Sequence, residues 1–189
     1  MSLVAWLDWL GQTPWSIALH ESQYVWPFTE SVHVLTLTIF AGTAAILDLR
    51  LLGLAFARVP VTALTLRLLP WTRFGFAIMV VTGVMLFYAT PLTYYYSIFF
   101  RVKLLLLAVA GVNVFVFHSR THRDATRWGE AVHLPRAARV AATVSLVAWA
   151  GVIVSGRLIA YNWFQCDLQP QSAFVNWAAG CPDVPAGAP

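Results

Sequence analysis

Charged side chains are scarce in this sequence: Asp, Glu, Lys and Arg together make up 11% of its 189 residues. A soluble domain carries about 25%. Apolar residues make up 59% and the mean hydropathy is +0.69, so the composition excludes a soluble globular domain and a disordered chain. The two cysteines are too few for a disulfide-rich scaffold. These properties predict an integral membrane protein.

Four long apolar runs follow one another, each near the roughly 20 residues that a helix needs to cross a bilayer. The runs are continuous and do not alternate with period 2, which favours helices over strands. Lipid also offers no partner to the backbone of an open strand. Because the connections are short, consecutive helices are expected to be antiparallel. We therefore predict an all-α, four-helix up-down bundle with spans at about 32–56, 74–90, 97–118 and 137–161.

The segments outside the spans carry their own signals. Tryptophans and scattered polar residues before the first span predict amphipathic helices on the outer membrane interface. Thr13-Pro14 has the pattern of an N-cap followed by Pro at the first helical position. A brief interfacial helix is also expected at 57–69. The predicted organisation is an outer interfacial segment at 1–30, the bundle at 31–161 and an outer tail at 162–189.

Basic residues are distributed unequally between the two sides of the predicted bundle. Nine arginines lie in or beside the loops after the first and third spans, whereas Arg101, Lys103 and Arg157 are the basic residues of the other side. Since Lys and Arg are retained in the cytoplasm, we predict a bacterial inner-membrane protein with both termini in the periplasm. The arginines flank apolar runs and form no basic face, so nucleic acid is not an expected partner.

Both cysteines, Cys166 and Cys181, follow the last span on the predicted periplasmic side. Because that compartment is oxidising, they are predicted to form a disulfide that staples the tail. Two free thiols or a metal-binding pair are the alternatives.

Ionisable residues inside a membrane are costly and are candidates for function. At the outer level the sequence places His20, Glu21, Glu30, His33, Arg101, Lys103 and Arg157. Imidazole is a good ligand for haem iron or copper, and the cations suit haem propionates or a quinone carbonyl. The alternative is a set of snorkelling side chains with a structural Glu–Arg pair.

One pairing of histidines is excluded by the topology. His33 and His118 lie at opposite faces of the bilayer, about 25–30 Å apart in depth, so they cannot share one haem. An outer haem would use His33 with His20, or His33 with Met85. At the inner level, His118, His122 and His133 could hold a metal ion, and a solvated cytoplasmic loop is the alternative.

Two polar positions lie within the spans towards the inner side. Asp48 and Arg50 are two residues apart and cannot meet on one helix face, so Asp48 is expected to find a partner on another helix, such as Arg73 or Arg120. A structural pair and a proton path are both open readings. Asn113 is expected to make an interhelical hydrogen bond.

The fourth span carries small residues at a spacing of four: Ala137, Ala141 and Ser145 form one such set, and Ala138 and Ala142 form another. This spacing lets helices approach closely. It fits packing inside the bundle, or docking of another subunit or a second copy through this helix.

Five stretches carry a family resemblance: Glu30-Ser31-Val32-His33-Val34-Leu35, Asp48-Leu49-Arg50-Leu51-Leu52-Gly53, Leu69-Pro70-Trp71 followed by Thr82-Gly83, Phe100-Arg101-Val102-Lys103, and 113–118. Over about residues 15–120 the sequence resembles an uncharacterised family of bacterial four-span inner-membrane proteins. It is more remotely similar to copper-resistance D type proteins and small b-type cytochromes, a likeness that implies metal or haem handling. It lacks their methionine-rich motifs and paired transmembrane histidines.

Three functions are therefore expected from the sequence. The first is a membrane-embedded redox or electron-transfer subunit with one b-type haem or quinone at the outer level, with His33 as ligand. The second is a copper- or metal-handling or transport protein. The third is a non-catalytic subunit that anchors or assembles a larger membrane complex.

Overall fold

All regular secondary structure in the described part of the chain is helical, which confirms the all-α prediction. The computed structural model describes residues 2–121, 135–161, 163–164, 166 and 169–181. Its helices are α1 (Leu3–Gly11), α2 (Pro14–Glu21), α3 (Val25–Leu52), α4 (Val61–Ala89), α5 (Pro91–Tyr96), α6 (Ile98–Thr121), α8 (Arg136–Ile159) and α9 (Ala173–Ala179).

Helices α3, α4, α6 and α8 are each long and apolar enough to cross a membrane. α3 and α4 have 28 and 29 residues. At 1.5 Å per residue they are both longer than about 40 Å, which exceeds the hydrocarbon core of about 30 Å. α6 and α8 have 24 residues each. The chain is therefore a multi-pass membrane protein.

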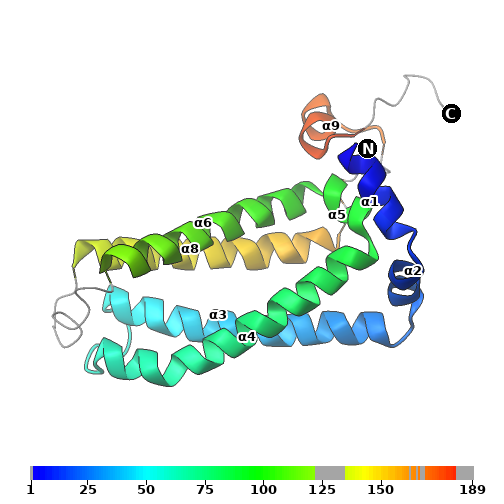
Figure 1. Ribbon diagram of the computed structural model, residues 1–189. Helices are drawn as coiled ribbons and strands as arrows, with labels where there is room; N and C mark the ends of the chain where they lie inside the picture. Colours follow the sequence, from blue (N-terminus) through cyan, green and yellow to red (C-terminus); the bar gives the residue numbers. More distant parts are fainter. Residues whose placement is uncertain (1, 122–134, 162, 165, 167–168, 182–189) are drawn as a thin grey trace.

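The four long helices form two hairpins, α3–α4 and α6–α8, that lie side by side (Figure 1). The hairpins meet mainly where α3 packs against α8. The helices α1, α2, α5 and α9 gather at one end of the bundle, which we call the cap end (Figure 1). The opposite end, where residues 53–60 connect α3 to α4, is called the loop end.

Two boundaries differ from the sequence prediction. α3 begins at Val25, ahead of the predicted start at 32, because Pro27 lies in its first turn, where a missing N–H breaks no helical bond. The separate interfacial helix predicted at 57–69 is wrong, since α4 runs unbroken from 61 to 89 with Pro70 inside it. Proline is tolerated there because neighbouring groups in a membrane bundle can satisfy the freed carbonyl.

Close packing within and between the hairpins depends on small residues. A Cβ atom at Gly75 of α4 would lie 3.2 Å from the backbone nitrogen of Phe40, so this glycine brings α4 against α3. On α8, Ala138 and Ala142 are completely buried beside Leu51. These alanines of the small-residue pattern therefore serve packing inside the bundle.

The cap end is tied to α4 through α2. Thr13 is the N-cap of α2 with Pro14 behind it, which confirms that predicted pattern. The buried hydroxyl of Ser16 donates to the last carbonyls of α4, those of Tyr88 (2.9 Å) and Ala89 (3.1 Å). Since these carbonyls have no partner within their own helix, α2 closes the end of α4.

Candidate functional site

His33 is half-buried in the cap-end half of α3 and faces α4. Its Nδ1 lies 2.8 Å from the Thr82 hydroxyl oxygen, and that hydroxyl lies 2.8 Å from the carbonyl oxygen of Ile78. A threonine hydroxyl has one proton. If it is donated to Ile78, the His33 Nδ1–H donates to Thr82, and Nε2 keeps its lone pair. Metal-binding and proton-accepting histidines are commonly oriented in this way.

Two glycines leave space for the side chains of His33 and Lys103. A Cβ atom at Gly83 would lie 3.3 Å from His33 Cε1. On α8, a Cβ atom at Gly156 would lie 3.7 Å from the ammonium nitrogen of Lys103. Lys103, half-buried on α6, lies within electrostatic range of the His33 ring. Residues from all four long helices therefore build this site.

Glu30 lies one turn before His33 on α3, nearer the cap end, and is exposed. Tyr94 of α5 packs against Phe87 and Phe100, with ring centroids 6.2 and 5.1 Å away. Burial and the nearby negative charge of Glu30 raise the pKa of Tyr94 to about 12. The phenol is therefore a neutral hydrogen-bonding group at the cap end of the bundle.

Arg101 has a role that the sequence did not indicate. Its guanidinium group donates to the carbonyls of Ala178 and Ala179, both at 2.6 Å, and to that of Tyr95 at 3.1 Å. A Cβ atom at Gly180 would lie 3.0 Å from this guanidinium, which explains a glycine at that position. Arg101 therefore holds the C-terminal end of α9 on α6.

The other predicted outer residues are more dispersed. Arg157 is exposed at the end of α8, with its guanidinium 5.4 Å from the centre of the Tyr161 ring. His20 is exposed, and its ring lies 5.6 Å from that of Trp26. Trp26 precedes His33 by seven residues on α3, about 10 Å of helix, so the two histidine rings do not meet. Met85 is half-buried on α4, one turn beyond Thr82.

The predicted inner metal site lies outside the described part of the chain. His122 and His133 are not among the described residues, and only the backbone of His118, in α6, is described. Within the described part of the chain, no group of three His, Cys, Asp or Glu side chains could hold a metal ion.

At the cap end, a disulfide joins Cys166 to Cys181, the pair that the sequence singled out.

Asp48 is buried in α3 near the loop end, with 8% of its surface exposed. Its interacting group is the hydroxyl of Ser145 on α8. Arg73, one of the two partners expected from the sequence, is exposed. Arg120, the other, has a side chain outside the described part. Asp48 therefore turns towards another helix, as predicted, but its partner is a neutral hydroxyl and not an arginine.

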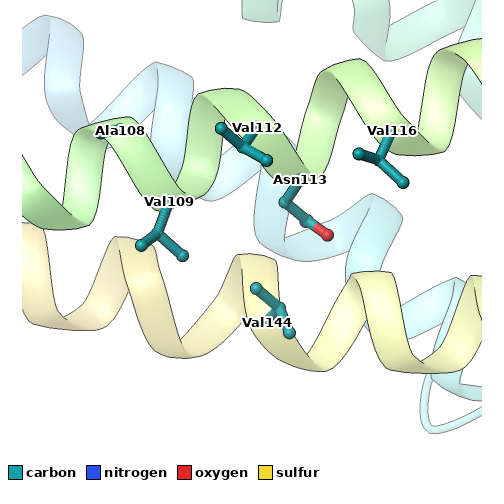
Figure 2. Close-up of a pocket in the computed structure, with 6 residues that line it drawn as sticks. All are labelled: Ala108, Val109, Val112, Asn113, Val116 and Val144. Carbon is teal, nitrogen blue, oxygen red and sulfur yellow. The ribbon is translucent and has the colours of Figure 1, made fainter.

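A groove of about 430 Å³ lies between α6 and α8 (Figure 2). Its walls are apolar apart from Asn113, whose Nδ2 donates to the Ala141 carbonyl at 2.9 Å. This bond confirms the predicted interhelical role of Asn113. The residues that line the groove are Ala108, Val109, Val112, Asn113, Val116 and Val144.

Some residues at this site could not be singled out from the sequence. Thr82, Gly83 and Gly156 are common residue types in membrane helices. The Thr82-Gly83 dipeptide was noted only as part of the family resemblance. A hydrophobic run has no polar face from which the orientation of such residues could be read.

The helices and their packing define a small multi-pass membrane protein built on a four-helix bundle. Residues 8–162 match the family described as a family of unknown function, DUF6644, and the chain belongs to it. This agrees with the predicted likeness to an uncharacterised four-span family. No curated protein and no solved structure matches the chain, so the comparisons give no support to the likeness to copper-resistance D type proteins or b-type cytochromes.

Proposed function

We propose that this protein is a membrane redox subunit that binds a quinone or quinol beside His33. The observation that carries the proposal is the orientation of the His33 ring on Thr82. With Nδ1–H engaged, Nε2 is the acceptor for the hydroxyl proton of a quinol. The Lys103 ammonium group, within electrostatic range of the ring, is a donor for a quinone carbonyl oxygen.

The packing of the helices supports access from the lipid. Among the described helices, α4 and α6 pack mainly on α3 and α8 and little on each other. His33 faces α4, and Lys103 lies on α6. The α4–α6 side is therefore the proposed entry for a molecule dissolved in the hydrocarbon core.

A b-type haem at His33 is the second candidate, because a ring that donates through Nδ1 leaves Nε2 as the ligand atom. Met85, one turn beyond Thr82, would be the second axial ligand. The quinone is favoured because a haem also needs cations for its two propionates. Of the three predicted cations, Arg101 is engaged with α9 and Arg157 is exposed over Tyr161.

The orientation in the membrane is part of the proposal. The excess of arginine near the loop end supports a cytoplasmic location of that end by the positive-inside rule. The cap end, with the Cys166–Cys181 disulfide, would then face an oxidising periplasm. The protein would reside in the bacterial inner membrane with its redox site near the periplasmic side.

The test is cofactor analysis of purified protein in native-lipid nanodiscs. Solvent extraction followed by chromatography quantifies quinone, and the reduced-minus-oxidised visible spectrum detects haem. His33→Gln should lower bound quinone by about tenfold, the effect of losing one well-placed hydrogen bond. Thr82→Val should lower the amount of bound quinone less, because this variant removes the hydrogen bond that orients the His33 ring but keeps the ring itself. His20→Gln, which changes an exposed histidine, is the matched control.

Each outcome separates the candidate functions. Quinone retained at the wild-type level in His33→Gln contradicts the proposal. A Soret band that disappears in His33→Gln and in Met85→Ala would identify the bound cofactor as haem and not quinone. Bound copper that depends on His33 and His20 favours metal handling. A protein without any bound cofactor favours an anchoring or assembly subunit.

A further inference from the structure

A buried carboxyl group, to which no described residue supplies a counter-ion, lies in the loop-end half of the bundle, separate from the proposed redox site. The Asp48 side chain is 8% exposed. Its Oδ2 atom is fully buried and has no hydrogen-bond partner among the described residues. Asp48 and His33 are 15 residues apart on α3, about 22 Å of helix, so no small ligand can bridge them.

Asp48 is surrounded by apolar packing on the face that α3 presents to α8. One turn further along α3, Leu51 packs on Ala138 and Ala142 of α8. On the other side of the Asp48 level, Phe40 packs on Trp149 with ring centroids 4.5 Å apart. The Ser145 hydroxyl lies between these two apolar contacts along α8 and is the polar group that Asp48 faces.

The charged and polar groups that the structure describes on the neighbouring elements are exposed or hydrogen-bonded elsewhere. On α3 itself, Arg50 is 4% exposed and donates its Nε–H to the carbonyl of Val59 at 2.6 Å. Arg73 on α4 and Arg139 on α8 are exposed. On α6, the Asn113 amide donates to α8. Within the described residues, Asp48 therefore has no ion pair.

An ionised carboxylate among these apolar contacts is disfavoured, because burial removes the solvation of its charge and no described cation pairs with it. The neutral acid leaves at most one hydroxyl without a partner, which costs far less. We propose that Asp48 is a proton-binding site: its carboxyl group takes up a proton from the aqueous phase at the loop end and releases it there. Asp48 lies four residues, about 6 Å of helix, before the end of α3 at the loop end.

Infrared spectroscopy tests the protonation state directly. Wild-type protein in nanodiscs at mildly acidic pH should show the C=O stretch of a protonated carboxylic acid, with the small shift in heavy water that identifies an exchangeable proton. Asp48→Asn, which keeps the shape and removes the proton, should lose this band. Glu30→Gln, which changes an exposed carboxylate of the same helix, should keep it. A wild-type spectrum without the band, or a band unchanged in Asp48→Asn, overturns the proposal.

A second measurement needs no variant and remains valid if Asp48→Asn does not fold. Dicyclohexylcarbodiimide, a lipid-soluble reagent, modifies protonated carboxyl groups and leaves a stable N-acylurea that mass spectrometry locates. At mildly acidic pH, Asp48 should be labelled more strongly than Glu30, because the buried carboxyl group is protonated and lies where a lipid-soluble reagent gathers. Equal or weaker labelling of Asp48 contradicts a protonated carboxyl. Protection of Asp48 by sodium ions would replace the proton site with a sodium site.

Discussion

The contact between Arg101 and α9 allows a quantitative test of how the cap end is held together. Two of the three carbonyls that Arg101 binds belong to the last turn of α9, at 2.6 Å each. A hydrogen bond from a charged donor contributes about 1.5–3 kcal/mol. Because the site is half-buried, water can hydrogen-bond to the freed carbonyls after mutation and recover part of this free energy. We therefore expect Arg101→Ala to weaken the docking of α9 by about 2–4 kcal/mol.

Hydrogen exchange is the appropriate assay, because the disulfide keeps α9 tethered while it undocks. The amides of α9 exchange when the helix opens locally. A loss of about 2–4 kcal/mol should speed their exchange by about 30- to 1,000-fold. The spans α3 and α8 should keep the wild-type rate, since the change is confined to the cap end.

Two further variants separate the shape of the guanidinium from its charge. Arg101→Lys keeps the charge but lacks the planar fork that reaches two carbonyls, so its effect should be intermediate. Arg157→Ala removes an exposed arginine that stacks on Tyr161 and should leave α9 unchanged. If α9 exchanges in Arg101→Ala at the wild-type rate, other contacts hold it and the reasoning fails.

Three other predictions follow from the sequence and the structure. A reporter that works only in the periplasm should be active after Pro189 and silent near Asp124; the reverse pattern would invert the proposed orientation. Because the pKa of Tyr94 is raised from 10.0 to about 12, the native state keeps a proton that the unfolded chain loses. Unfolding measurements should show its contribution intact up to about pH 10 and falling between about pH 10 and 12, and Tyr94→Phe should remove that decline. In Gly75→Ala the new Cβ atom would lie 3.2 Å from the Phe40 backbone, so this variant should lower the free energy of unfolding by about 1–3 kcal/mol. Gly42 has open space around it, and Gly42→Ala should stay within about 1 kcal/mol of wild type. Equal effects of the two variants would argue against close α3–α4 packing.

Composition and the length of the apolar runs were sufficient to predict the four membrane-spanning helices. Local signals also predicted the start of α2 at Thr13-Pro14. These features depend on the bilayer thickness and on backbone hydrogen bonding, which act on each segment separately. The start of α3 and the unbroken α4 were not predicted, because Pro27 and Pro70 signal a boundary only when the surrounding structure cannot accommodate them.

The side-chain environments were decided by the tertiary structure alone. In a helix that is apolar all round, no hydrophobic face tells which residues turn inward. The sequence grouped His33, Lys103 and Arg101 at one level, yet the fold places Lys103 near His33 and commits Arg101 to α9. It likewise brings Asp48 to Ser145, where an arginine was expected. Depth in the membrane is readable from the sequence because it depends on the distance along one helix, whereas contacts between helices depend on the rotation of each helix about its own axis, which only packing determines.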